Sequence, residues 1–93
     1  MQKQYKRISE YQLRKAAGKY WLLYMEQDGV PYIPPFPINA VAAEIWMELQ
    51  AGKSQGEIVD ALSLQYDISR EEMKEDMQAF IRQLEVQGIK VEE

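Results

Sequence analysis

Cysteine and histidine are both missing from the 93 residues. Without cysteine the chain has no disulfide and no thiolate chemistry, which fits a reducing, cytoplasmic environment. Without histidine it lacks the commonest general base, the commonest metal ligand and the simplest pH switch. The sequence also contains no Walker loop, G-x-S-x-G motif or dinucleotide-binding fingerprint. We therefore expect a protein that is not an enzyme and that uses no metal and no cofactor.

Long apolar runs are lacking as well. No stretch approaches the roughly 20 residues needed to span a bilayer. The charged opening "MQKQYKRISEY" has no apolar core of the kind found in secretion signals. The sequence thus predicts a cytoplasmic protein with no membrane partner. With 46% hydrophobic residues, a chain of this length is expected to form one domain around one core.

Basic residues outnumber acidic ones only in the first fifth of the chain. Residues 1–19 carry a net charge of +5 and the remainder carries −9, which gives −4 overall. We predict a basic, flexible segment over residues 1–10 and a single domain over residues 11–91. Arg14, Lys15 and Lys19 lie in patterned sequence and are candidate contacts for an acidic partner. The alternative is a set of solvated surface charges.

Two hydrophobic periods divide the domain. Gly18 and Asp28-Gly29 are predicted turns, and Tyr, Trp, Val and Ile are enriched on either side of them. This pattern predicts strands over 11–16 and 19–26 and a third strand that starts near residue 30. After Asn39, which is a predicted N-cap, the period becomes 3.6 residues and indicates helices. Ser54 and Ser69 open two further helices with S-x-x-E capping boxes.

Three strands followed by three helices predict an α+β fold in which an antiparallel meander precedes the helices. Gly52 and Gly88 are the predicted ends of the first and third helices. The expected buried stripes of the helices are Val41, Ala42, Ile45, Trp46 and Leu49; Ile58, Val59, Leu62 and Tyr66; and Met73, Met77, Phe80, Ile81 and Leu84.

The stretch "VPYIPPFPIN", residues 30–39, holds all four prolines of the chain. Proline cannot donate to a sheet ladder, so a strand here belongs at a sheet edge. Backbone groups of alternate residues face opposite sides of a strand. Pro31, Pro35 and Pro37 share the side of Ile33, which predicts that the odd-numbered side is the open edge. A polyproline-type connector is the alternative interpretation of "PPFP".

Taken in order, the helical positions and their spacings resemble the PqqD family, over about residues 11–90. The residues that carry the likeness are Ile38, Asn39, Ala42, Ile45, Trp46, Leu49, Gly52, Ser54, Glu57, Ile58, Leu62, Tyr66, Ile68, Met73, Asp76, Met77, Phe80, Ile81, Leu84 and Gly88. The resemblance implies a winged-helix-like domain that is not an enzyme. Such a domain binds the leader of a ribosomally made precursor peptide and presents it to a modifying enzyme, such as a radical-SAM protein or a leader protease.

In that family the leader adds a strand to the third strand and packs against the third helix. The binding residues that the resemblance implies here are Val30, Tyr32, Ile33, Pro35, Met73, Met77 and Phe80. Lys74 is a further candidate for an electrostatic contact with the leader, beside the basic residues of the hairpin. Core packing is the alternative role of Met73, Met77 and Phe80.

Two other functions share the predicted fold. A winged-helix DNA binder would use residues 70 onward for recognition, but "REEMKED" sets four carboxylates against two cations, so we expect no nucleic-acid partner. An oligomerisation module would use the same open strand edge, and a homodimer through that edge stays an alternative.

Overall fold

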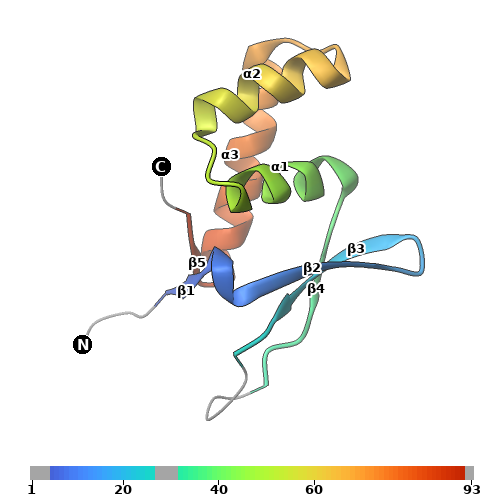
Figure 1. The fold of residues 1–93 in the computed structure, drawn as a ribbon, viewed down its shortest axis with the longest axis vertical. Coiled ribbons are helices and arrows are strands. Elements are labelled where there is room, and N and C mark those ends of the chain that lie inside the picture. The colour runs from blue at the N-terminus through green and yellow to red at the C-terminus, as the bar shows by residue number, and fades with distance from the viewer. Residues whose placement is uncertain (1–4, 27–31, 92–93) are drawn as a thin grey trace.

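The computed structural model describes residues 5–26 and 32–91 (Figure 1). Its elements in chain order are β1 (Lys6–Arg7), the short 3-10 helix η1 (Ile8–Glu10), β2 (Tyr11–Ala16), β3 (Lys19–Tyr24), β4 (Phe36–Ile38), α1 (Ala40–Gln50), α2 (Gln55–Tyr66), α3 (Arg70–Val86) and β5 (Ile89–Lys90). Strands β2, β3 and β4 form a three-stranded antiparallel sheet in that order. The predicted α+β fold, with a meander followed by three helices, is confirmed.

The β2–β3 hairpin turns at Ala17 and Gly18. Both residues have positive φ, 54° and 76°, as a two-residue type I′ turn requires. The register pairs Ala16 with Lys19 next to this turn, and β2 has the predicted bounds. β3 ends at Tyr24, two residues before its predicted end.

The third strand is shorter than the sequence predicts. β4 covers Phe36–Ile38, and residues 32–35 have no regular secondary structure. The predicted start near residue 30 and the Asp28-Gly29 turn lie outside the described residues. Pro34 and Pro35 explain the late start, because consecutive prolines fix φ and remove two donors from the ladder.

The predicted caps begin all three helices. The Asn39 side chain accepts a hydrogen bond of 2.7 Å from the amide three residues on. Ser54 and Glu57 form the reciprocal capping box of α2. At α3, the Ser69 hydroxyl accepts from the Glu72 amide at 3.0 Å. The Glu72 side chain does not return a bond to the Ser69 backbone, so the capping box predicted there is only half formed. In the described ranges, no helix combines the length and the apolar character needed to cross a membrane.

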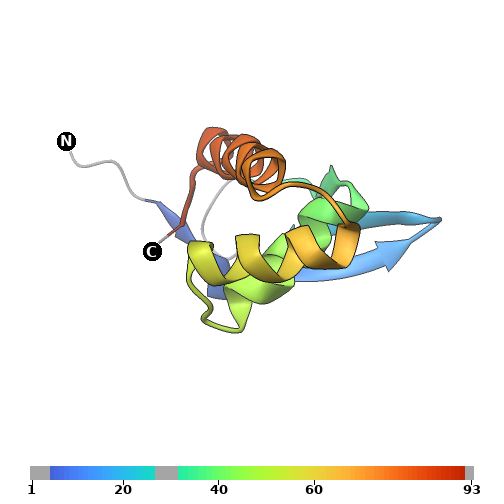
Figure 2. The same ribbon diagram turned by 90° about the horizontal axis from the view of Figure 1, so that it is seen from above.

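The three helices pack on one face of the sheet, as Figures 1 and 2 show. Alternation along the strands turns Leu22 and Ile38 toward the helices, and both are buried. Trp46 of α1 is fully buried near the centre of the core. The other buried apolar residues are Tyr11, Ala42, Ala43, Ile45, Ile58, Val59, Leu62, Met73, Met77, Phe80, Leu84 and Ile89.

Within the segment predicted to be flexible, residues 1–10, the chain forms regular elements from Lys6 onward. β1 pairs in parallel with β5, with Lys6 opposite Ile89. The Lys6 amide also donates to the Gly88 carbonyl at 2.7 Å. Two strands of two residues each, at opposite ends of the chain, carry no periodic signal, and their pairing is therefore not visible in the sequence.

Candidate functional site

β4 lies at an edge of the sheet, because the strand order is β2–β3–β4. It pairs with β3 through Ile38 opposite Tyr20 and Phe36 opposite Leu22, with Pro37 between them. Proline has no N–H, so the flanking pairs are the ones that can exchange two hydrogen bonds with β3. The backbone of Pro37 then faces the open edge, to which it offers a carbonyl acceptor and no donor.

A hollow of about 230 Å³ opens between the start of α1 and the middle of α3. It begins at Asn39, the residue directly after β4. Its lining residues are Asn39, Val41, Ala42, Ile45, Asp76, Ala79, Phe80 and Gln83. Val41, Ala79 and Phe80 form an apolar part of its wall, and the exposed polar residues Asn39, Asp76 and Gln83 form the rest. A strand edge and a partly apolar hollow therefore lie next to each other.

Basic side chains gather at the β2–β3 turn. Arg14, Lys15 and Lys19 are all exposed. The Lys15 ammonium lies 5.4 Å from the centroid of the Tyr20 ring, an attractive cation–π arrangement. Lys19 directly precedes Tyr20, and Tyr20 pairs with Ile38, the last residue of β4. The hairpin cations consequently lie near the end of β4 from which the hollow starts.

Comparison with known proteins identifies the family. The family described as coenzyme PQQ synthesis protein D (PqqD) matches residues 20–89. This chain belongs to the PqqD family. A search of curated proteins gives no match. Among solved structures, TbiB1 in complex with the TbiA(beta) leader peptide superposes with a TM-score of 0.67 at 25% identity, covering 90% of each chain.

The structure divides the binding residues that the PqqD resemblance implied into two groups. Met73, Met77 and Phe80 are 0%, 1% and 3% exposed and belong to the core, although Phe80 also lines the hollow. Tyr32 is 74% exposed, Ile33 is half-buried and Pro35 is exposed. These three lie in the irregular segment before β4. Val30 lies outside the described residues.

The α3 side of the hollow contains residues that were not predicted as binding residues from the sequence. Asp76, Ala79 and Gln83 lie on the flank of α3 next to its apolar stripe. The hydrophobic repeat of α3 identifies the helix face that packs in the core. The residues that line the hollow lie on the neighbouring side of the helix, so the repeat does not reveal them. The signal that could have found them is the i, i+3, i+7 row beside the stripe.

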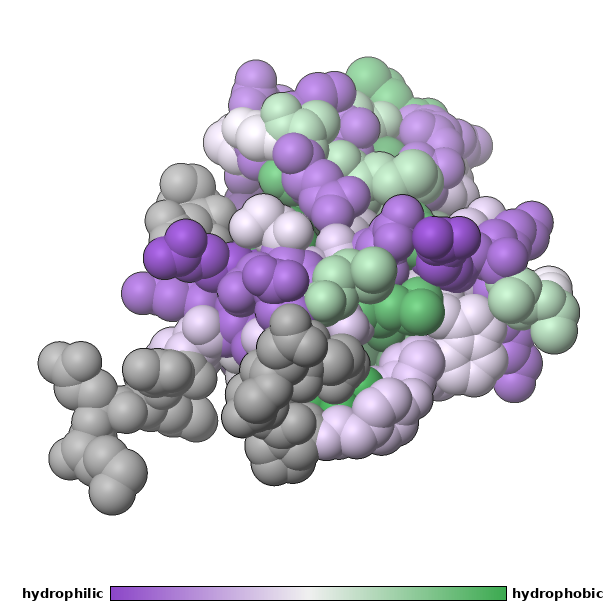
Figure 3. All heavy atoms as spheres, turned by 60° about the horizontal axis from the view of Figure 1, so that its bottom comes forward, coloured by the Kyte–Doolittle hydropathy of each residue, from purple (hydrophilic) through white to green (hydrophobic). Residues whose placement is uncertain are grey.

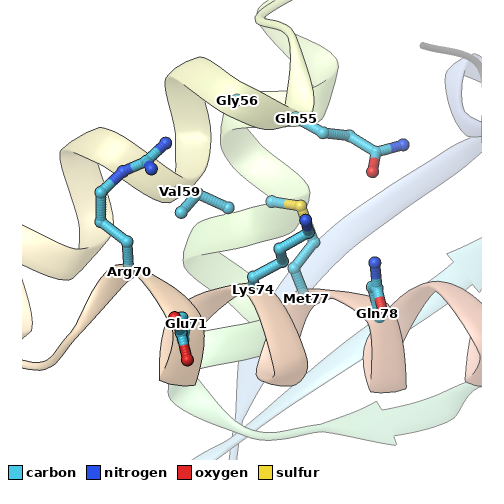
Figure 4. Close-up of a pocket in the computed structure, with 8 residues that line it drawn as sticks. All are labelled: Gln55, Gly56, Val59, Arg70, Glu71, Lys74, Met77 and Gln78. Atoms are coloured by element: carbon cyan, nitrogen blue, oxygen red, sulfur yellow. The ribbon is translucent and has the colours of Figure 1, made fainter.

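Lys74 lies on a different flank of α3. It lines a second hollow, of about 440 Å³, between α2 and α3 (Figure 4). Val59 and Met77 contribute apolar surface to this hollow, and Gln55 and Gln78 contribute amides. Lys74 is therefore not grouped with the basic residues of the β2–β3 turn.

The α2–α3 surface has little positive charge to offer a nucleic acid. The Arg70 guanidinium is 2.6 Å from the Asp60 carboxylate, so one of the two cations at the start of α3 is already paired. Glu71, Glu72 and Glu75 are exposed on the same turns. Nothing in this arrangement favours DNA binding. Across residues 5–26 and 32–91, no group of three or more acidic side chains is arranged to hold a metal ion.

Proposed function

We propose that this chain is a peptide-binding domain that holds the leader of a ribosomally made precursor peptide and presents it to a modifying enzyme, such as a radical-SAM protein or a leader protease. The domain itself is not catalytic and works in the cytoplasm, where ribosomes make the precursor. The observation that carries the proposal is the open edge of β4 beside a partly apolar hollow against α3. The TbiB1 leader-peptide complex, with the same fold, supports it.

Strand addition to β4 provides the backbone part of recognition. An extended guest paired antiparallel with β4 places its amides against the carbonyls of the open edge. The edge accepts more hydrogen bonds than it returns, since Pro37 cannot donate. Backbone pairing alone tolerates many guest sequences, so specificity has to come from side chains.

The hollow provides the side-chain part of recognition. Alternate side chains of a guest strand point toward α3, and one of them can enter the space between Val41, Ala79 and Phe80. Apolar walls favour an apolar side chain there. Asp76 and Gln83 at the rim favour polar or basic neighbours in the guest. The predicted contribution of Met73 and Met77 is then indirect, because they support the wall from within the core.

Amide and methyl chemical shifts of the labelled domain test this placement. The ligand is a synthetic peptide with the leader sequence of a candidate precursor peptide. We expect the largest changes at Tyr32, Ile33, Ile38, Ala79 and Phe80, and smaller changes at the Met73 and Met77 methyls. Changes confined to α2 would refute the placement.

A pair of matched substitutions separates the hollow from the rest of the surface. Ala79→Trp fills the hollow from an exposed helix position and is expected to weaken leader binding roughly tenfold or more, since it removes the apolar pocket. Ala61→Trp makes the same change at an exposed position of α2 and is expected to leave affinity unchanged. Equal affinity of both variants, measured by calorimetric titration, would exclude the hollow as part of the site.

A further inference from the structure

The sheet has a second face that no described helix covers. Because side chains alternate along a strand, the neighbours of the buried Leu22 point the opposite way. Trp21 and Leu23 of β3 therefore face outward, together with Gln12 and Arg14 of β2. Figures 1 and 2 show all three helices on the other side of the sheet.

This outer face holds an apolar hollow of about 310 Å³. Its lining residues are Arg14, Ala16, Trp21, Leu23 and Pro35. The Trp21 indole N–H donates to the Ala16 carbonyl at 3.3 Å, which fixes the ring across the hairpin. In Figure 3, apolar and pale residues gather on this side of the molecule between hydrophilic ones. Arg14 is the cross-strand partner of Trp21, and tryptophan and arginine are both enriched among the residues that contribute most to binding at protein interfaces.

The charge of the outer face has one sign. Arg14 and Lys19 are the charged residues at the outward positions of β2 and β3, and the outward positions of β4 and Pro35 are uncharged. A symmetric pair of copies through this face would set these cations against each other, which disfavours a second copy as the occupant. The same cations favour a surface that carries carboxylates.

We propose that the outer face of β2, β3 and Pro35 is a docking surface for a second protein, one that presents an apolar strip flanked by aspartate or glutamate. The inference rests on the proposed function, in which the leader occupies the β4 edge and the α3 flank. The outer face stays accessible in that complex. The domain can consequently hold its peptide and a protein partner at the same time, on different surfaces.

The test uses peptides of defined charge as stand-ins for the partner. The first is a capped amphipathic helix of about four turns made of leucine and glutamate; in the second, lysine replaces glutamate. We expect the acidic peptide to shift the Trp21 indole resonance and the Leu23 amide saturably, and the basic peptide to shift neither. Shifts confined to the β4–α3 hollow, or equal binding of both peptides, would overturn the proposal.

Substitutions assign the contributions of charge and apolar area. Arg14→Gln with Lys19→Gln removes two exposed charges and is expected to weaken binding of the acidic peptide about 2- to 30-fold, while Lys74→Gln has no effect. Leu23→Thr retains a residue that favours β-strands but removes apolar area from the outer face. We expect it to weaken binding of the acidic peptide roughly tenfold. Leu64→Gln, at a residue that is 84% exposed on α2, is the matched control. Loss of binding in the Leu64 variant, or none in the Leu23 variant, contradicts the assignment.

Leader titration of the Leu23→Thr variant separates this inference from the proposed function. We expect it to bind the leader with unchanged affinity while it loses the acidic peptide. If the parent binds the leader at the β4 edge but does not bind the acidic peptide, the docking surface is wrong and the proposed function stands. Outer-face shifts that appear on concentrating the domain alone would identify a second copy as the occupant and refute the proposal.

Discussion

Tyr11 combines burial with an ionisable hydroxyl at the start of β2. It is 5% exposed, and its ring lies 5.2 Å from that of Tyr24 and 6.1 Å from that of Trp46, centroid to centroid. The Trp46 ring is nearly perpendicular to it, and the buried Trp46 indole nitrogen has no hydrogen-bond partner among the described residues. Burial raises the pKa of the Tyr11 hydroxyl to about 12, and the nearby Tyr24 and Glu10 add to the rise.

This raised pKa predicts a loss of stability at alkaline pH. The neutral hydroxyl is favoured in the folded state, so its contribution is complete below pH 10 and is lost as the pH rises through about 12. Between pH 10 and about pH 12, the unfolding free energy of the parent should therefore decrease more than that of Tyr11→Phe. The expected difference between the two losses is on the order of 2 kcal/mol. Urea unfolding at several pH values measures both slopes. Tyr5→Phe, at an exposed residue, should retain the steep slope, and parallel curves for parent and Tyr11→Phe would contradict the prediction.

Among the elements, α2 shows how a capping box between two nearby residues determines where a helix begins. The Glu57 amide donates to the Ser54 hydroxyl at 3.2 Å, and the Ser54 amide donates to the Glu57 carboxylate at 2.9 Å. The bond from the Ser54 amide lowers the pKa of Glu57, and the Ser54 side chain adds to this effect. Ser54→Ala removes the cap and should cost about 0.5–2 kcal/mol of unfolding free energy at pH 7. Ser9→Ala, an exposed serine outside the helices, is the control.

The same box makes the stability of α2 sensitive to acid. Because the folded-state pKa of Glu57 is lowered, its contribution is present above the ordinary value of 4.5 and is lost as the pH falls through the folded value. Chemical denaturation between pH 7 and pH 3 should show a smaller loss in Glu57→Gln than in the parent. A larger loss in the variant would mean that the carboxylate does not contribute through its charge.

The elements also show what the sequence could not specify. Caps at Asn39, Ser54 and Ser69 join residues three apart, so the chain itself contains the information. The length of β4 depends on where pairing with β3 becomes possible after two prolines, and the β1–β5 pair depends on contacts between the two ends of the chain. In the site, the open edge was predictable from proline spacing. The hollow was not, because it depends on how α1 packs beside α3.

The position of Pro37 inside β4 allows a direct test of the open edge. Pro37→Val restores one donor on that side and should tighten leader binding about 2- to 10-fold, the effect of one net hydrogen bond. Pro35→Val, before the strand, is expected to have a smaller effect, and Pro34→Val none. Calorimetric titration measures the affinities. Sedimentation tests the second consequence, that a less protected edge promotes homodimers. No change in either property for Pro37→Val would place the leader elsewhere.

At the scale of the whole molecule, positive charge is concentrated at one end of an acidic protein. The basic β2–β3 turn carries Arg14, Lys15 and Lys19, whereas the chain as a whole has a net charge of −4. Exposed charges act mainly on the rate of encounter, and their reach is about 8 Å at physiological salt. For an acidic leader, changing all three to Gln should slow association and flatten its salt dependence, with the dissociation rate little altered. Stopped-flow mixing at several salt concentrations measures both rates.

A slower association of the hairpin variant could result from its lower net charge or from the loss of charge at the β2–β3 turn, so a control has to separate the two effects. Changing Lys53, Arg82 and Lys90 to Gln gives the same net charge of −7 as the hairpin variant but keeps the basic turn. If steering depends on position, this control associates with the acidic leader at nearly the parent rate, because none of its removed charges is on the β2–β3 hairpin. If the two variants slow association equally, the leader responds to the overall field of the domain. An unchanged rate in the hairpin variant at low salt would show that these cations do not steer the leader.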